Sequence, residues 1–359
     1  MKIKIIVGLM LMLSILLGCT EAPSAPSTQE VTIGVMLPLS GDVASYGEGV
    51  MKGLQMAVKD SDVNVVLKVE DSKCEGKEAV SAINKLISLD GVDAILGELC
   101  SGATLAAAPV AEENQVVMVS PASTSPDISE AGDFIFRTIP SDALQGVFAA
   151  NLIYDADFRK LSILYSNEDY GVGISNVISK AFTDLGGEVV ASETYERKSV
   201  DLRAQLTKIK GSGADAIFIA GNSPDSFVAA LKQIQELGLE VALYGSEGLK
   251  APYTTENAGL AAEGLIVSSV SSGTSDFIAK HNAEFGEGPG PFAAQGYDAL
   301  TSIVWAVKLG ATTPVEIKDN LYNVQFDGAS GNIVFDDKGE VSGNYEVYVV
   351  SDGAFVLVE

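Results

Sequence analysis

The sequence predicts an α/β protein with two similar domains, each built on a doubly wound parallel sheet. Three observations lead to this fold class. The chain has 359 residues, 47% of them hydrophobic, which is enough for two cores of ordinary size. Buried-strand and amphipathic-helix patterns alternate along the chain, and the alternation occurs twice. Each half also opens with a strand, a loop and a Tyr-Gly-x-Gly sequence entering a helix, at 46–49 and at 170–173.

The first half begins with a short apolar run, Val31–Leu37, which is typical of a buried strand. The helix that follows places Val50, Leu54 and Ala57 on one face, and the later helices repeat this spacing. The expected strands of this half are 31–37, 64–69, 94–97 and 116–119, and the expected helices are 46–59, 77–89 and 101–114.

The second half shows the same alternation of strand and helix. Its expected strands are 161–165, 189–192, 216–220 and 241–244, and its expected helices are 172–185, 202–210 and 226–237. Alternation of this kind predicts parallel sheets covered by helices on both faces. Ligands of such sheets bind outside the carboxyl ends of the strands, so two facing domains should form a cleft. Tyr46 and Tyr170 would each stand where the first strand of a domain ends.

The composition excludes several classes of function. Forty-eight acidic residues against twenty-three basic ones give a net charge of −25, which disfavours binding to nucleic acid. The single histidine, His281, excludes most catalytic triads and imidazole metal sites, and we expect it on a surface helix at 275–285. Gly47, Gly49 and Gly53 have the wrong spacing for a dinucleotide fingerprint and lie well past the strand. We expect no cofactor and no metal.

The N-terminus has the pattern of an export signal. Two lysines precede an apolar run, Ile5–Leu17, which is short for a membrane span and has the length of a signal-peptide core. Gly18-Cys19 then completes a pattern similar to a lipoprotein box. We expect 1–18 to be a signal peptide, Cys19 to carry lipid, and 19–30 to be a flexible tether. The alternative is a plain secretory peptide that leaves a spare thiol. Either interpretation predicts a mature protein outside the cytoplasmic membrane, periplasmic or at the cell surface.

The cysteine count agrees with export. With a lipid on Cys19, Cys74 and Cys100 are the remaining pair, and exported proteins fold in an oxidising compartment. A disulfide between them would close a loop of about 26 residues and constrain the unfolded chain by roughly 3.5 kcal/mol. The alternative is two separately buried free cysteines. Two cysteines and one histidine cannot form a four-ligand zinc site, so we expect a structural role.

A few polar residues stand near the ends of the predicted strands. Ser101 opens a helix, so its hydroxyl and the first free N–H groups form a ready anion site, although a lone serine would be only an N-cap. Pro121 and Pro126 bound a loop, the proline-bounded loop, which we expect to be extended with hydroxyls and N–H groups free to donate. Glu247 follows a strand of the second half. Each signal alone is weak, because such residues are more often a cap, a surface loop or a solvated acid.

Together these residues resemble one family. The segment Val65–Thr124, which includes both cysteines of the expected disulfide, is similar to the leucine/isoleucine/valine-binding proteins of ABC importers. The similarity covers essentially the whole mature chain, including 33–47, 166–171, 245–248 and 290–300. It implies a type I periplasmic binding fold, in which two lobes are joined by a three-strand hinge with a ligand cleft between them. The implied lobes are 31–140 plus 271–345 (N-terminal) and 141–270 plus 346–359 (C-terminal).

The resemblance also implies which residues bind the ligand. In that family the serine after the second cysteine, here Ser101, binds the α-carboxylate of an amino acid. Backbone and hydroxyl groups of Ala122 and Thr124 assist it. The α-ammonium is held by the same threonine and by the glutamate of the Gly-Ser-Glu-Gly turn, here Glu247. The donors thus come from the first half and the acid from the second, so closure around a zwitterion joins charges that neither half satisfies alone.

The walls of the cleft follow from the same resemblance. Tyr46 and Tyr170 wall the cleft, and Phe292 matches a family aromatic near the side-chain pocket. The branched-chain binders tend to carry an aromatic residue where this chain has Asn222-Ser223. Asn222 is therefore expected to line a wider or more polar pocket, which leaves the side-chain preference open.

The predicted function is that of a monomeric, lipid-anchored solute-binding protein that captures an amino acid. By the resemblance, this is a branched-chain amino acid (Leu, Ile or Val) delivered to the permease subunits of an ABC transporter in the membrane. The alternative is a sensor of the same fold that binds an amino acid or amide and docks with a signalling receptor. A secreted enzyme is a third hypothesis, but with one histidine its general-base chemistry would rest on Asp or Glu alone. We expect no enzyme activity.

Overall fold

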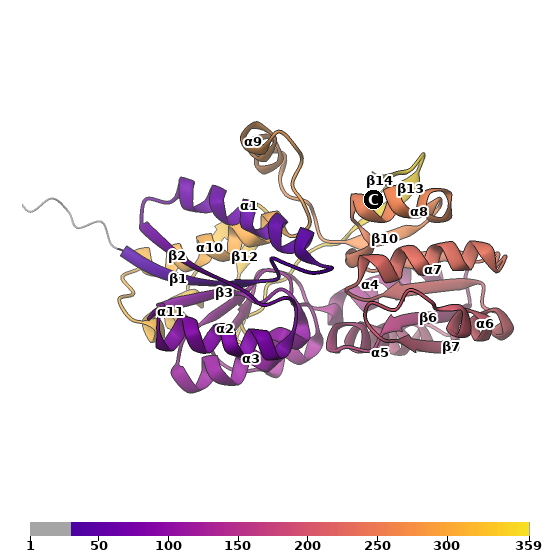
Figure 1. Cartoon of the computed structure of the whole chain (residues 1–359), viewed down its shortest axis with the longest axis horizontal. Helices are drawn as coiled ribbons and strands as arrows, with labels where there is room; N and C mark the ends of the chain where they lie inside the picture. The colour runs from indigo at the N-terminus through magenta and orange to yellow at the C-terminus, as the bar shows by residue number, and fades with distance from the viewer. Residues whose placement is uncertain (1–29, 359) are drawn as a thin grey trace, which may run out of the picture.

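The computed structural model describes residues 30–358 (Figure 1). The predicted signal peptide, Cys19 and all but the last residue of the predicted tether lie outside the described residues. Two β-sheets lie end to end along the long axis of the molecule, each covered by helices (Figure 1). Within 30–358, no helix combines the length and the apolar character that crossing a membrane requires.

The first sheet has five parallel strands in the order β2-β1-β3-β4-β5. They are β1 (Glu30–Leu37), β2 (Asn64–Asp71), β3 (Ala94–Gly97), β4 (Met118–Ser120) and β5 (Ile135–Arg137). Ile33 of β1 lies opposite Leu67 of β2 and Ala94 of β3, and Ile33 and Ala94 are fully buried. Burial on both faces explains why β1 and β3 read as nearly continuous apolar runs.

Helices cover both faces of this sheet and complete what we call the N-terminal lobe. On one face α1 (Ala44–Asp60) packs against α10 (Ala293–Lys308), and on the other α2 (Gly76–Ser88) packs against α3 (Ser101–Asn114) (Figure 1). The lobe also holds the 3₁₀ helix η1 (Pro126–Glu130), α9 (Ser275–Phe285), α11 (Pro314–Leu321) and the two-stranded ribbon of β11 (Gln325–Asp327) and β12 (Asn332–Val334).

The second sheet has seven strands in the order β14-β13-β10-β9-β8-β6-β7 and forms the centre of the C-terminal lobe. The parallel strands are β6 (Lys160–Ser166), β7 (Glu188–Tyr195), β8 (Ala216–Ala220), β9 (Ala242–Gly245) and β10 (Ile266–Ser269). The strands β13 (Glu346–Ser351) and β14 (Ala354–Leu357) add antiparallel pairs at one edge. Two parallel sheets were predicted; the first is parallel throughout, whereas the second is mixed, with antiparallel pairing at one edge.

Helices again pack on both faces of this second sheet. One face carries α4 (Asp142–Asp155) and α5 (Asp169–Asp184). The other face carries α6 (Arg203–Ser212), α7 (Pro224–Glu236), α8 (Pro252–Ala258) and the 3₁₀ helices η2 (Glu247–Leu249) and η3 (Gly259–Ala262). The chain passes between the lobes after β5, after β10 and after β12. The residue boundaries given above for the two lobes stay predictions.

The Tyr-Gly pair at the start of α1 and of α5 has the same structural role in both lobes. Tyr46 lies in the first turn of α1 and Tyr170 in the first turn of α5. A Cβ at Gly47 would lie 2.0 Å from the carbonyl oxygen of Pro38, and one at Gly171 would lie 2.2 Å from that of Ser166. Each glycine therefore lets the start of a helix approach the end of the preceding strand closely. This approach brings both tyrosine rings to the edge where the lobes meet.

One expectation about the surface was wrong. The helix α9 has the predicted bounds, but His281 on it is fully buried rather than exposed. Its ring lies 4.7 Å from the ring of Phe285 and 6.0 Å from that of Phe277, and its Nδ1 lies 2.9 Å from the carbonyl oxygen of Glu287. The loop after α9 folds back over the histidine, which the helical pattern alone does not reveal.

Candidate ligand-binding site

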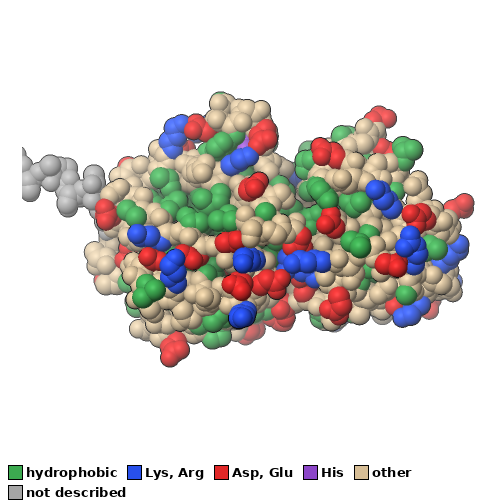
Figure 2. Space-filling view, in the orientation of Figure 1, with side chains coloured by type: hydrophobic (Ala, Val, Ile, Leu, Met, Phe, Trp, Pro, Cys, Tyr) green, Lys and Arg blue, Asp and Glu red, His purple; other side chains and the backbone are tan. Residues whose placement is uncertain are grey.

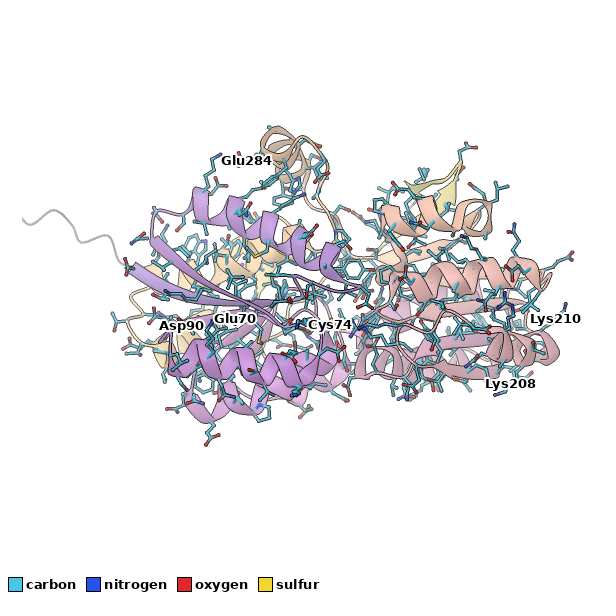
Figure 3. All side chains as sticks on the ribbon, viewed as in Figure 1. Glu70, Cys74, Asp90, Lys208, Lys210 and Glu284 are labelled. Carbon is cyan, nitrogen blue, oxygen red and sulfur yellow. A yellow bond between two sulfur atoms is a disulfide. The ribbon has the colours of Figure 1, made fainter. Side chains whose placement is uncertain are left out.

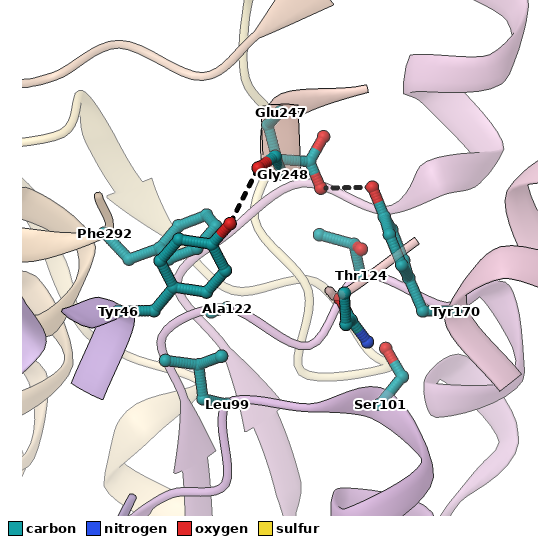
Figure 4. A pocket seen from close by; sticks show the side chains of 10 residues that line it. Tyr46, Leu99, Ser101, Ala122, Thr124, Tyr170, Glu247, Gly248 and Phe292 are labelled. Atoms are coloured by element: carbon teal, nitrogen blue, oxygen red, sulfur yellow. Dashed lines mark hydrogen bonds between the residues drawn. The ribbon is translucent and has the colours of Figure 1, made fainter. Parts of the chain in front are cut away.

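A small cavity lies between the two lobes, at the carboxyl ends of their parallel strands (Figure 4). Its volume is only about 10 Å³, which is room for about one water molecule. All eight residues predicted to contact a ligand line it, together with Leu99 and Gly248; the eight are Tyr46, Ser101, Ala122, Thr124, Tyr170, Asn222, Glu247 and Phe292. The structure thus brings the predicted set together, and the role assigned to each residue stays a prediction.

Ser101 begins α3 on the N-terminal side of the cavity. Cys100 occupies the N-cap position before it, so the simple N-cap interpretation of Ser101 was wrong. The Oγ of Ser101 instead accepts a hydrogen bond of 3.1 Å from the N–H of Ser125. A serine hydroxyl accepts and donates at once, so its hydrogen stays available for an acceptor in the cavity. The position at a helix N-terminus also favours a negatively charged partner.

Cys74 and Cys100 form a disulfide, which ties the start of α2 to the start of α3. Glu98, fully buried just before it, accepts hydrogen bonds from the Ser72 hydroxyl and from the N–H of Cys100. Burial raises the pKa of Glu98 to about 7, and these hydrogen bonds oppose that rise. Glu98 therefore helps to orient the turn that presents Ser101.

The proline-bounded loop is held by a buried arginine. Arg137 donates from Nη1 to the carbonyl oxygens of Ser123 and Ser125, at 3.2 and 2.9 Å. The expectation that the N–H groups of this loop are free was wrong for three residues. The N–H groups of Ala122 and Ser123 donate to the Ser120 hydroxyl at 3.3 and 2.9 Å, and the N–H of Ser125 donates to Ser101. The loop is tied to its own lobe at these residues, while its alanine and threonine line the cavity.

The opposite side of the cavity is acidic. Glu247 begins η2 and is only 7% exposed. Its Oε1 accepts a hydrogen bond of 3.1 Å from the Tyr170 hydroxyl (Figure 4). Its Oε2 is buried and has no hydrogen-bond partner within residues 30–358. A buried, unpaired carboxylate oxygen is costly, so this atom is suited to receive a cationic donor.

Tyrosine and phenylalanine rings close the cavity on one side. The Tyr46 hydroxyl donates to the carbonyl oxygen of Gly248 at 2.7 Å, which joins the two lobes directly (Figure 4). The rings of Tyr46 and Phe292 meet edge to face with their centroids 5.9 Å apart. Leu99 adds an apolar surface beside them. These side chains offer an apolar contact for whatever lies between the donors and Glu247.

Asp142 is a further buried acid, next to the cavity residue Thr124, and was not predicted. It sits in the first turn of α4, its N–H donates to the carbonyl oxygen of Thr124 at 2.8 Å, and neither carboxyl oxygen has a partner among the described residues. Burial raises the pKa of Asp142 well above its usual range, and the nearby charge of Glu247 raises it further. Burial likewise raises the pKa of Glu247. The empty cavity therefore disfavours the negative charge of both carboxyls.

Sequence reasoning missed Leu99, Gly248, Glu98 and Asp142. Leu99 and Gly248 lie in the same turns as the predicted residues Ser101 and Glu247. The position of these turns at strand ends could therefore have indicated them as cavity residues. Glu98 and Asp142 look like ordinary surface acids in the sequence. Within residues 30–358, no group of three or more His, Cys, Asp or Glu side chains is arranged to hold a metal ion.

Comparison with known proteins identifies related chains. The family model for periplasmic binding proteins matches residues 30–354. The leucine-, isoleucine-, valine-, threonine- and alanine-binding protein of Pseudomonas aeruginosa is 30% identical to this chain over 334 residues, which cover 89% of either protein.

Two solved structures share the fold over 92% of this chain. The leucine binding protein LivK from Thermotoga maritima is similar with a TM-score of 0.87 and 30% identity, over 98% of its own chain. A solute binding protein of an ABC transporter from R. palustris, in complex with benzoate, has a TM-score of 0.84 and 21% identity, over 95% of its chain. The predicted type I periplasmic binding fold is thereby confirmed, and the chain belongs to the periplasmic binding protein family.

Proposed function

We propose that this protein captures a branched-chain aliphatic amino acid outside the cytoplasmic membrane and delivers it to the permease of an ABC transporter. One observation carries the proposal, namely the division of charge across the cavity. Hydrogen-bond donors of the N-terminal lobe face a buried, unpaired carboxylate oxygen of Glu247 on the C-terminal lobe. An amino-acid zwitterion supplies an acceptor for the first side and a cation for the second.

The apolar side chains of the cavity support an aliphatic ligand. Leu99, Tyr46 and Phe292 offer carbon surface, and Asn222 adds a polar side chain to the lining. The relatives named for leucine, isoleucine and valine agree with this ligand class. The protein then acts as a monomer that carries its ligand and performs no chemistry on it.

Benzoate, the ligand of one structural neighbour, fits this charge pattern less well. It has a carboxylate for the donors around Ser101 but no cation for Glu247. Binding it would leave the unpaired oxygen of Glu247 in place and would add a negative charge near Asp142. We therefore propose an amino acid rather than a simple aromatic acid.

A calorimetric screen of the twenty amino acids and benzoate against residues 30–359 tests this proposal. The expected result is binding of leucine, isoleucine or valine at micromolar concentration or below, and no heat from benzoate. Binding of benzoate alone would contradict the proposal. A sensor of the same fold would bind the same ligands, so copurification with a permease rather than with a signalling receptor separates these two roles.

The affinity for an amino acid should fall as the pH is lowered. In the ligand-free protein, burial raises the pKa of the Glu247 and Asp142 carboxyls. A bound ammonium favours the charged forms and so lowers these pKa values again. Binding therefore releases protons, and affinity is full above the raised pKa values and is lost below them. Leucine titrations between pH 4.5 and 8 in two buffers of different ionisation enthalpy measure both effects. An affinity that stays constant or increases on acidification would rule out this linkage.

The lipid anchor depends on Cys19 in our proposal. Cys19→Ser should abolish lipid attachment and either release the protein or leave its precursor uncleaved, without changing the fold. Membrane fractionation and mass spectrometry of the N-terminal peptide measure the result. Cys74→Ser is the control, because it should leave lipid attachment intact. A Cys19→Ser protein that is still acylated and membrane-bound would mean that the lipoprotein motif was misidentified.

A further inference from the structure

A group of charged side chains joins the two lobes outside the ligand cavity. Arg197, in the loop after β7, donates from Nη2 to Asp42 Oδ1 at 2.9 Å and from Nη1 to the carbonyl oxygen of Cys74 at 3.0 Å. Both acceptors belong to the N-terminal lobe. The side chains of Arg197 and Asp42 are only 13% and 12% exposed, so solvent and salt screen this pair less than a surface pair.

Two further residues extend the contact at its rim. Lys198 Nζ lies 3.5 Å from Asp42 Oδ1 and 3.5 Å from Glu75 Oε1, and Arg197 Nη1 lies 3.6 Å from Glu75. We call Arg197, Lys198, Asp42 and Glu75 the inter-lobe cluster. Figure 2 shows basic and acidic side chains gathered where the lobes meet, and Figure 3 shows Cys74 at this junction. Two cations of one lobe thus face two acids of the other.

The inter-lobe cluster is connected to the cavity on both sides. On the N-terminal lobe, the cysteine that accepts from Arg197 is bonded to Cys100, the residue before Ser101. On the C-terminal lobe, Arg197 Nε lies 4.0 Å from Glu168, and Glu168 accepts a hydrogen bond of 3.1 Å from the N–H of Asn222. Ser101 and Asn222 both line the cavity. Movement of the lobes relative to each other would therefore change the cluster and the cavity together.

The net negative charge of the protein indicates what this contact does. With a net charge of −25, two acidic lobes repel each other as they approach. We propose that Arg197 is a positioning residue that offsets this repulsion and holds the lobes in the closed arrangement without touching the ligand. Its role in affinity rests on the proposed function, because a ligand held by both lobes binds in proportion to the closed fraction.

The first test measures the lobes without any ligand. Small-angle X-ray scattering compares ligand-free wild type, Arg197→Gln and the control Arg203→Gln. Arg203 is matched in chemistry, but its partners Asp201 and Glu236 lie in its own lobe. Arg197→Gln should have a larger radius of gyration than wild type, and Arg203→Gln should not. Raising the sodium chloride concentration from 50 to 500 mM should contract Arg197→Gln, because salt screens the repulsion between the acidic lobes, and should change wild type less.

The second test measures affinity with L-leucine as the probe. Arg197→Gln should weaken binding about tenfold, since the apparent dissociation constant rises as the closed fraction falls. Asp42→Asn should weaken leucine binding by a similar factor. The variant that carries both substitutions should lose less affinity than the product of the two single losses, because the two side chains contact each other. Arg203→Gln should bind within twofold of wild type. The melting temperature of the ligand-free protein should change little in any of these variants, which a purely structural role of Arg197 would not predict.

Two results would overturn the proposal. One is scattering of ligand-free Arg197→Gln that matches wild type at both salt concentrations. The other is a leucine affinity of Arg197→Gln no weaker than that of Arg203→Gln. Failure of wild type to bind leucine would contradict the proposed function instead, and scattering would then decide the role of Arg197 by itself.

Discussion

Glu247→Ala is expected to weaken amino-acid binding by about a hundredfold. A charge-assisted hydrogen bond contributes roughly 1.5–3 kcal/mol, which corresponds to about tenfold to more than a hundredfold in affinity. The alanine variant removes the acceptor of the ligand ammonium and leaves that ammonium unpaired, so its loss should lie at the upper end. Glu247→Gln keeps one acceptor oxygen and the size of the side chain, so its loss should lie near tenfold. Isothermal titration with leucine measures both variants.

Two controls separate this effect from damage to the fold. Without ligand, Glu247→Ala should be at least as stable as wild type, because it removes a buried carboxylate with an unpaired oxygen. The deaminated analogue 4-methylpentanoate should bind wild type poorly and should bind the alanine variant equally poorly. An alanine variant that binds leucine within threefold of wild type would show that another acid holds the ammonium.

Replacing both Cys74 and Cys100 with serine should lower the stability of the N-terminal lobe by about 3.5 kcal/mol. The chain-entropy estimate for a disulfide with a sequence separation of 26 residues gives this value. Leucine binding should weaken as well, because the disulfide anchors the turn that presents Ser101. Urea unfolding of the ligand-free protein, with and without a reducing agent, measures the loss of stability.

The reducing agent provides the control for this prediction. It should destabilise wild type and leave the double serine variant unchanged. Non-reducing peptide mapping of exported protein should find the two cysteines in one linked fragment. Free thiols at both positions, or a loss of stability below about 1 kcal/mol, would contradict the structural role given to this bridge.

The site was predictable where a strand end or a turn fixes a residue locally. Ser101 and the proline-bounded loop follow β3 and β4, which are neighbours in the sheet, so parallel topology brings them to one edge. Glu247 follows β9 in the same way. Periodicity and turn chemistry report such positions directly, and the family resemblance supplied their roles.

Other features depend on tertiary packing and could not be read from the sequence. Asp142 has the position of an ordinary first-turn acid, and only the packing of both lobes around it buries its carboxyl. Arg197 and Asp42 are 155 residues apart in the chain, so no local pattern connects them. His281 was expected at the surface because its helix reads as exposed, while the loop that covers it lies beyond the helical pattern.

A crystal structure of the protein with bound leucine tests the central claim most directly. The claim is that both lobes bind the same zwitterion. Hydrogen-bond donors of the N-terminal lobe bind its carboxylate, and the unpaired carboxylate oxygen of Glu247 on the C-terminal lobe binds its ammonium. The expected density places the ligand carboxylate within hydrogen-bond distance of the Ser101 hydroxyl and the ligand ammonium within hydrogen-bond distance of Glu247 Oε2. Leucine bound in the reverse orientation, or outside the cavity between Ser101 and Glu247, would contradict it.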